Sequence, residues 1–438
     1  MTSPVRAIAE NCKRASRKLA SSTSEQRIAA IRAAAELIEQ SRASLLQINA
    51  QDLEAARQML DGGEINTATF ERLRLTDKKI TEMTRSMLAV AELPDPIGRV
   101  LQRTELDAGL LLEKITCPLG VLAIIFEARP DAVTQISALG LKSANAVILK
   151  AGREVEGTAS ALVQIVRHAL TNSGLPEDSV ALVTGRESVQ QLLSMSDLVD
   201  MVIPRGSKQL VEFVQAHTRI PVLGHAEGVC HIYVDAVADP DMALAIIDDS
   251  KTDYPAACNA AETVLVHEQI AGSFLPRLAE RLRSRQVAIR GCEKTRAILA
   301  GQPVDPVADG EWHTEYLDLV LAVRVVNSMD DAIEHIHTYG SSHTESIVTQ
   351  DATAAERFLA EVDAAGVFHN ASTRFADGYR YGFGAEVGIS TSKLHARGPV
   401  GLEGLTTYKY VLRGTGQLAC SYQGKTAKTF THKRLPSD

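Results

Sequence analysis

Cys258 is the residue of this sequence whose surroundings best suit chemistry. It lies in the stretch DYPAACNAAETVLVH, residues 253–267, after a helix-like run (MALAIIDDS) and just before a strand-like run. The proline and the small residues around it keep bulky side chains away from the sulfur, which suits attack on an acyl carbon. A cysteine judged without context is more often a small buried hydrophobic residue. A nucleophile and a core residue are therefore the two alternatives.

Two strand ends offer groups for a phosphate or a cofactor hydroxyl. LVDMVIP leads into PRGSKQLVEFV, so Gly206 and Ser207 lie where a strand ends and a helix begins, and a helix N-terminus attracts phosphate. NAVILK ends on Lys150, with Arg153 close behind, and a cation at a strand end suits a cofactor. An ordinary turn and a solvated lysine are the alternatives. The GxGxxG pattern and the Walker P-loop are both absent from the sequence.

Two further polar clusters give weaker signals. His335, His337 and His343 match no common zinc spacing, and HExxH is missing, so the sequence predicts no metal site. The glycine-rich segment 370–405 mixes aromatic with polar residues, as pockets do, and long loops of this kind tend to be functional. A solvated linker is the alternative for that segment.

Hydrophobic periodicity predicts the elements that position these residues. In the first hundred residues apolar positions such as Ile31 and Ile38 recur at helical spacing, after N-cap candidates at 22–24. Short β-branched runs then alternate with helical patterns. These runs are VLAIIF (121–126), NAVILK (145–150), SVALVT (179–184), LVDMVIP (198–204), HIYVD (231–235) and ETVLVH (262–267). Continuous apolar strands joined by helices predict an α/β fold with a parallel sheet covered on both faces.

Two stretches look peripheral to that fold. Residues 103–120 have the pattern of a hairpin around an Asp-Ala-Gly turn. Residues 408–425 form a polar, strand-like tail.

The composition excludes several classes of protein. The 438 residues carry 46 Lys+Arg against 54 Asp+Glu, a net charge of −8, which argues against an overall basic nucleic-acid binder. There is no run of about 18 uncharged apolar residues and no signal-peptide-like start, so we expect a cytoplasmic protein without a membrane partner. The six cysteines contain no CxxC pair, which argues against a disulfide framework.

Three long stretches resemble the aldehyde dehydrogenase superfamily, and within it the branch that reduces an acyl phosphate to an aldehyde. The resemblance covers nearly the whole chain, and its most specific stretches follow in the right order: CPLGVLAIIFEARPDAVTQISALGLKSANAVILKAGRE, DYPAACNAAETVLVH and FGAEVGISTSKLHARGPVGLEGLTTYKYV. The resemblance implies a Rossmann-like cofactor domain, an α/β catalytic domain that carries the cysteine, and a small β extension for oligomerisation.

The same resemblance implies domain boundaries. Residues 1–102 and 121–228 correspond to the NADP-binding domain, and residues 229–404 correspond to the catalytic domain. Residues 103–120 and 405–438 correspond to the oligomerisation elements.

The resemblance also assigns cofactor-binding residues. Lys150 is similar to the lysine that contacts the adenosine ribose, and Gly206 and Ser207 are similar to the Gly-Ser pair over the pyrophosphate. Glu315 is similar to the acidic residue that holds the nicotinamide ribose, although the family's Phe-Gly-Pro-Val run is Tyr-Leu-Asp-Leu-Val here. The branch uses NADPH, and Arg153 is the candidate partner of its 2′-phosphate.

Cys258 is similar to the family's nucleophile, but two neighbouring catalytic positions differ. Oxidative members have an oxyanion-binding asparagine where this chain has Glu127, so we expect the Cys258 backbone N–H or the Asn259 side chain to bind the oxyanion. The general-base position falls on Gly224, with Glu227 nearby. Loss of that base suits a reductase, because an activated water would hydrolyse the thioester that hydride should reduce.

The resemblance implies NADPH-dependent reduction of L-glutamyl 5-phosphate to glutamate 5-semialdehyde through a Cys258 thioester, with release of phosphate, in proline biosynthesis. The anionic substrate needs local cations, and Arg129 is the candidate for its phosphate or α-carboxylate. The weaker candidates for the glutamyl end are Asn370, Ser372, Thr373 and Arg374.

Two other functions remain open at this point. An oxidative or CoA-acylating aldehyde dehydrogenase would share Cys258 and Lys150. A binding protein that keeps a degenerate dehydrogenase fold is the second, and the intact cysteine loop argues against it. The family resemblance further implies a homo-oligomer. A complex with glutamate 5-kinase, the enzyme that makes the unstable substrate, is a partner that the sequence leaves open.

Overall fold

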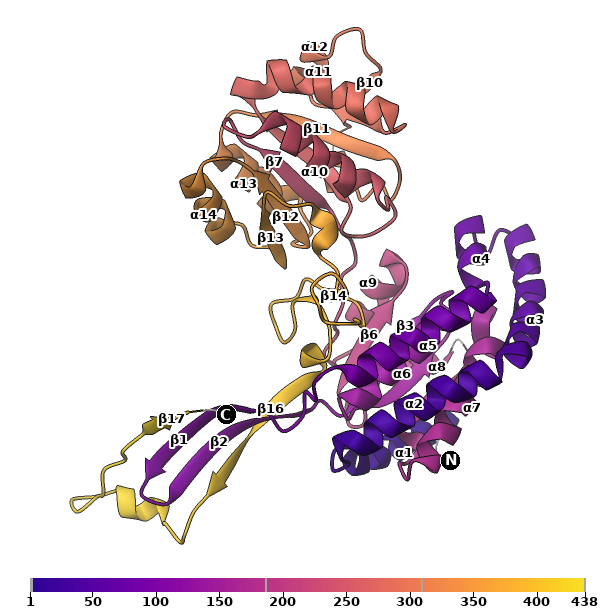
Figure 1. Cartoon of the computed structure of the whole chain (residues 1–438), viewed down its shortest axis with the longest axis vertical. Coiled ribbons are helices and arrows are strands. Elements are labelled where there is room, and N and C mark those ends of the chain that lie inside the picture. The colour runs from indigo at the N-terminus through magenta and orange to yellow at the C-terminus, as the bar shows by residue number, and fades with distance from the viewer. Residues whose placement is uncertain (1–2, 186, 309, 437–438) are drawn as a thin grey trace. The chain divides into compact units, whose positions relative to one another are not determined.

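A computed structural model describes residues 3–185, 187–308 and 310–436 (Figure 1). The chain forms two compact units. Unit 1 comprises the chain up to Leu223, Phe383–Val387 and the chain from Val400 onward, and unit 2 comprises Gly224–Gly382 and Gly388–Pro399. The main division falls after Leu223, five residues before the predicted boundary at 228.

The described part of unit 1 begins with helices: α1 (Pro4–Leu19), α2 (Ser24–Gln40), α3 (Arg42–Asp61), α4 (Thr67–Leu73) and α5 (Asp77–Glu92). The predicted start of α2 is confirmed, with Thr23 as its N-cap. The Thr23 side chain accepts a hydrogen bond from the Gln26 N–H, and the Gln26 side chain accepts one from the Thr23 N–H. The predicted apolar positions Ile31 and Ile38 are fully buried.

The core of unit 1 is a parallel sheet with the strand order β5-β4-β3-β6. Its strands are β3 (Val121–Phe126), β4 (Ala146–Lys150), β5 (Val180–Val183) and β6 (Met201–Arg205). Its helices are α6 (Pro130–Lys142), α7 (Glu156–Asn172), α8 (Glu187–Leu193) and α9 (Lys208–His217). Strand order reverses between β3 and β6, and open α/β sheets bind ligands at the carboxyl ends of strands at such a point. The predicted α/β fold with parallel strands is confirmed.

A second sheet of unit 1 is antiparallel, with the order β16-β2-β1-β17. The predicted hairpin is confirmed: β1 (Val100–Asp107) and β2 (Leu110–Pro118) flank a turn in which Gly109 has a φ of +72°. The predicted strand-like tail is confirmed only in part. β16 (Thr406–Arg413) pairs with β2, whereas Ala419–Tyr422 is a 3₁₀ turn, and β17 (Lys433–Leu435) closes the other edge.

Unit 2 contains a parallel sheet with the order β10-β9-β11-β8-β7-β12-β13. Its strands are β7 (Cys230–Val234), β8 (Ala261–His267), β9 (Ala288–Gly291), β10 (Val304–Pro306), β11 (Val320–Val326), β12 (Thr344–Val348) and β13 (Gly366–His369). Its helices are α10 (Pro240–Thr252), α11 (Glu268–Ser284), α12 (Glu293–Ile298), α13 (Met329–Tyr339) and α14 (Ala352–Glu361). The predicted strands HIYVD and ETVLVH are confirmed as β7 and β8.

The glycine-rich segment 370–405 passes through both units. It contains the 3₁₀ turns Thr373–Phe375 and Glu403–Leu405 and the short pair β14 (Ile389–Ser390) and β15 (Gly398–Pro399). None of the described helices is long and apolar enough to cross a membrane.

Candidate active site

Cys258 lies in a loop of unit 2 that joins α10 to β8 and is half-buried. Two consecutive turns shape the loop, because the Ala257 N–H donates to the Tyr254 carbonyl at 3.1 Å and the Ala260 N–H donates to the Ala257 carbonyl at 2.9 Å. The backbone of Cys258 packs directly on Gly228, where a Cβ would overlap the cysteine carbonyl group. Glycine is therefore required at 228 by close backbone approach.

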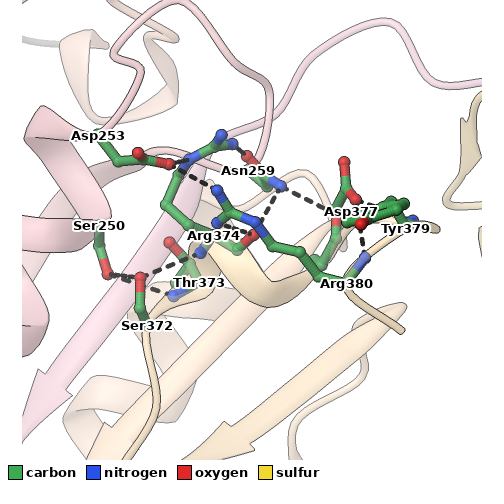
Figure 2. A network of polar contacts seen from close by, with 10 residues as sticks. Ser250, Asp253, Asn259, Ser372, Thr373, Arg374, Asp377, Tyr379 and Arg380 are labelled. Atoms are coloured by element: carbon green, nitrogen blue, oxygen red, sulfur yellow. Dashed lines mark hydrogen bonds and ion pairs between the residues drawn. The ribbon is translucent and has the colours of Figure 1, made fainter. Parts of the chain in front are cut away.

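A network of hydrogen bonds fixes both ends of the cysteine loop (Figure 2). The Asn259 amide donates to the carbonyl of Ala376 at 2.9 Å and to that of Arg374 at 3.5 Å. The Arg374 guanidinium in turn donates to the Asn259 side-chain oxygen and, at 3.0 Å, to the Asp253 carboxylate. Arg380 also donates to Asp253, at 2.9 Å.

These hydrogen bonds also keep the Asp253 carboxyl group in its charged form. Hydrogen bonds from Arg380 and Arg374 lower the pKa of the Asp253 carboxyl, so the carboxylate stays charged and keeps both arginines at the loop. The loop is thus fixed where it leaves α10 and again immediately after Cys258.

Two histidines lie beside Cys258 that sequence reasoning did not connect with it. One ring nitrogen of His225, one of His343 and the Cys258 sulfur all lie within 4.8 Å of one another. Burial lowers the pKa of His343 well below its usual value, because the ring is completely enclosed. His335 and His337 are directed elsewhere: His335 contacts Arg324, and His337 accepts a hydrogen bond from the Asp363 N–H.

In unit 1 the predicted cofactor residues gather at the carboxyl edge of the sheet. Ile125 of β3 pairs with Lys150, the last residue of β4, and Phe126 of β3 pairs with Arg205 of β6. Lys150 therefore lies at the same edge of the sheet as Glu127 and Gly206, which come directly after β3 and β6. Ser207 caps α9, its side chain accepting a hydrogen bond from the Leu210 N–H. Burial lowers the pKa of Lys150, whose ammonium donates to the Ala151 carbonyl.

At the same edge of the sheet a carboxylate lies where the sequence predicted a phosphate-binding site. Glu127 accepts a hydrogen bond from the Ser207 N–H at 2.9 Å, at the N-terminus of α9. A Cβ on Gly206 would clash with this carboxylate. Arg153 forms an exposed ion pair with Glu64 at 2.6 Å, and Arg129 is exposed at the N-cap of α6.

The comparisons with known proteins agree with this architecture. The model of the aldehyde dehydrogenase family matches residues 2–296. The chain belongs to the aldehyde dehydrogenase family. A gamma-glutamyl phosphate reductase from a Cyanothece species is 53% identical, with 98% of this chain and 97% of the relative covered. The one from Natronomonas pharaonis is 48% identical, covering 100% of this chain and 99% of the relative.

Solved structures give the same result for the fold. The crystal structure of gamma-glutamyl phosphate reductase from Thermotoga maritima matches with a TM-score of 0.92 and 41% identity, covering 95% of this chain and 100% of that chain. An acetylating aldehyde dehydrogenase from Geobacillus thermoglucosidasius matches with a TM-score of 0.65 and 18% identity, over 94% of this chain and 97% of that chain. The predicted aldehyde dehydrogenase-like α/β fold is therefore confirmed.

The residues predicted for the glutamyl end bond to the protein itself. Asn370 exchanges hydrogen bonds of 3.0 Å with the backbone of Thr349. Ser372 contacts the Ser250 hydroxyl at 3.0 Å, and the Thr373 N–H donates to that hydroxyl at 3.2 Å. Ser372, Thr373 and Arg374 belong to the hydrogen-bond network around Asn259 (Figure 2), and contact of any of the four residues with a substrate stays a prediction.

Asn259, one of the two predicted oxyanion donors, also bonds to the protein itself. Both hydrogens of its amide are donated to main-chain carbonyls, so an oxyanion would have to compete with those bonds. The amide is placed to hold the loop, which leaves the Cys258 backbone N–H as the remaining donor of the two that the sequence suggested.

The remaining predicted positions lie in unit 2. Gly224 and Glu227 are half-buried in the segment before β7. Glu315 is half-buried and lies near Glu262, which forms a buried 2.7 Å ion pair with Lys251. Burial, with a smaller contribution from the charge of Glu315, raises the pKa of the Glu262 carboxyl to about 7.

Substitution of Gly228 tests whether the Cys258 backbone must stay where it is. Because an alanine Cβ would overlap the cysteine carbonyl, Gly228→Ala is expected to displace Cys258 and lower kcat/KM by about 100-fold or more. Gly272→Ala is the matched control, since a Cβ there meets nothing within 4 Å. Steady-state kinetics of both variants check this, and a Gly228→Ala enzyme with more than about a third of wild-type activity contradicts it.

Proposed function

We propose that this chain reduces L-glutamyl 5-phosphate to L-glutamate 5-semialdehyde with release of phosphate, the second step of proline biosynthesis from glutamate. The observation that carries the proposal is the sequence identity to relatives named gamma-glutamyl phosphate reductase, which extends over nearly the full length of the chain. The Cyanothece protein is 53% identical over 98% of this chain. The position of Cys258 in a loop fixed at both ends supports the same reaction, because a nucleophile must be held in place.

Cys258 is the nucleophile in this proposal. Its thiolate forms a bond to the acyl carbon, the bond from that carbon to the phosphate oxygen breaks, and phosphate leaves with the bonding electrons. The product is a thioester on Cys258. The Cys258 backbone N–H stabilises the oxyanion of the tetrahedral intermediate, while Asn259, bonded to Ala376, keeps that N–H in position.

The missing general base supports reduction over hydrolysis. The position that carries the base in oxidative members of the family is Gly224 in this chain, and a glycine cannot activate water. The thioester therefore survives until it is reduced. Glu227 lies three residues further along, and this proposal gives it no catalytic function.

Membership of the aldehyde dehydrogenase family supports a nicotinamide cofactor, and we propose NADPH. The bound cofactor supplies the hydride. The carboxyl edge of the unit 1 sheet has suitable groups, because it combines the backbone N–H groups at the start of α9 with the buried Lys150. Gly206 and Ser207 are assigned to the pyrophosphate, Lys150 to the adenosine ribose and Glu315 to the nicotinamide ribose.

Arginines complete the proposed contacts to anions. Arg153 is assigned to the 2′-phosphate, which would take the place of its exposed partner Glu64. Arg129, exposed at the start of α6, is assigned to the phosphate or the α-carboxylate of the substrate. Arg374 is nine-tenths buried and already bonded to Asp253, so we propose that it acts on the substrate through the loop.

Glu127 competes with the cofactor in this scheme. Its carboxylate already occupies the Ser207 N–H that the pyrophosphate would use, and its charge repels a second anion. We therefore expect Glu127→Gln to lower the Kd of NADPH by about 3- to 10-fold, of the order of one charge at a helix N-terminus.

The matched control is Glu212→Gln, which removes one charge from an exposed position on the same helix and should leave the Kd unchanged. Titration calorimetry with NADPH measures both variants. Unchanged or weaker binding by Glu127→Gln would contradict the competition.

Cys258→Ser tests the nucleophile. A serine hydroxyl is not ionised near neutral pH, so we expect phosphate-dependent reduction of NADP⁺ by glutamate 5-semialdehyde to fall below a tenth of the wild-type rate, with NADPH binding retained. A control with CoA in place of phosphate separates this reaction from that of a CoA-acylating aldehyde dehydrogenase, the alternative. Cys420→Ser, at an exposed cysteine, should retain full activity.

We further propose that the antiparallel sheet of unit 1 contacts a second copy of the chain. Tyr408, Tyr410 and Leu412 on the edge strand β16 are all about half exposed or more, and an exposed apolar strand edge favours pairing. Light scattering should give the mass of an oligomer, and Tyr410→Lys should lower it. A complex with glutamate 5-kinase is a separate proposal, supported by the lability of acyl phosphates.

A further inference from the structure

Three adjacent strands of unit 2 bring Cys258, His225 and His343 together. His225 lies in the segment before β7, Cys258 in the loop before β8, and His343 immediately before β12. These strands pair in the order β8-β7-β12 and run parallel, so their amino ends meet at one edge. Among the described residues, no other three His, Cys, Asp or Glu side chains come this close.

Both histidines have the hydrogen bonding of metal ligands. The Nδ1–H of His225 donates to the Ile389 carbonyl at 2.8 Å, which leaves the ring's lone pair on Nε2 in the neutral form. The Nδ1 of His343 lies 2.9 Å from the Thr344 hydroxyl. A metal-binding histidine is usually held in this way, with one ring nitrogen bonded to a protein oxygen and the other facing the ion.

The Nε2 of His343 gives an independent reason to expect a ligand. His343 is completely buried, and within the described chain this nitrogen has no hydrogen-bond partner. Leaving a buried polar atom unsatisfied costs about 1–3 kcal/mol, so most such atoms have a partner or bind something. Thr344 satisfies only the opposite nitrogen of the ring.

We propose that Cys258, His225 and His343 form a binding site for a divalent transition-metal ion of the zinc type. One thiolate and two imidazoles are donors that Zn²⁺ accepts, and tetrahedral zinc with three protein ligands keeps its fourth position for water. Zinc–ligand bonds of about 2.0–2.3 Å place ligand atoms roughly 3.5 Å apart, so side chains within 4.8 Å need only a small movement.

Binding at this site would block the proposed reaction. The ion takes the electron pair of the Cys258 sulfur and releases the thiol proton to solvent, so no thiolate is left to attack an acyl carbon. This consequence rests on the proposed function, whereas the metal site itself does not. Removal of the ion by a chelator should restore the nucleophile.

Cobalt(II) is the probe, because a cobalt–thiolate bond gives a charge-transfer absorption band in the near ultraviolet. The full chain, stripped with a chelator and kept reduced with a phosphine, is titrated with Co²⁺. We expect the band to saturate at one ion per chain and to disappear in Cys258→Ser. Removing one of three ligands in His225→Gln should weaken Co²⁺ binding by more than about tenfold.

Matched controls are His168→Gln and Cys420→Ser, which alter an exposed histidine and an exposed cysteine and should leave the titration unchanged. Circular dichroism shows whether each variant is folded, and His225 is only half-buried, so its variant is expected to fold. A band that persists in Cys258→Ser, equal affinity in His225→Gln, or no band at all would overturn the site.

A kinetic measurement separates this site from the proposed function. Zn²⁺ should inhibit the phosphate-dependent reaction of the wild-type chain, and chelation should restore the rate. Zn²⁺ that binds without inhibiting would overturn the blocking of Cys258. If the chain lacks the proposed activity altogether, the cobalt titration still decides the site, because it needs neither substrate nor cofactor.

Discussion

Parallel strand pairing is the constraint on which both groups of functional residues depend. Paired strands that run in the same direction bring their ends to one edge of the sheet, so residues far apart in the sequence meet there. In unit 1 the carboxyl ends of β3, β4 and β6 bring Glu127, Lys150 and Gly206 to one edge. In unit 2 the amino ends of β7, β8 and β12 bring two histidines to Cys258.

The sheet alone does not fix the cysteine loop, because strand pairing does not constrain a loop between a helix and a strand. Buried polar groups supply that support. Arg374 links Asp253 at the start of the loop to Asn259 next to the nucleophile. Removing the Asp253 carboxylate would leave the largely buried Arg374 guanidinium without its charged partner. The position of the sulfur is thus coupled to the stability of the segment 374–380.

The sequence was enough to predict what depends on local pattern. The continuous apolar run 121–126 became β3, and the small residues around Cys258 pointed to a loop open to chemistry. The contacts of Asn259 and Glu127 were not predictable in this way. Each side chain bonds to a backbone group brought close by tertiary folding, Ala376 in one case and Ser207 in the other. His225 was missed for the same reason, since only strand order brings it to the cysteine.

In the segment before β7 we expect this chain to differ from the oxidative members of the aldehyde dehydrogenase family. In those enzymes the segment provides a base that activates water, and we predict that Gly224 occupies that position in this chain. The following residues serve the nucleophile instead. Gly228 packs on the Cys258 backbone, the Cys230 thiol donates to the Cys258 carbonyl at 3.3 Å, and a His225 nitrogen lies within 4.8 Å of the sulfur. These contacts fix the Cys258 backbone and place an imidazole nitrogen beside the sulfur, so the segment positions the proposed nucleophile.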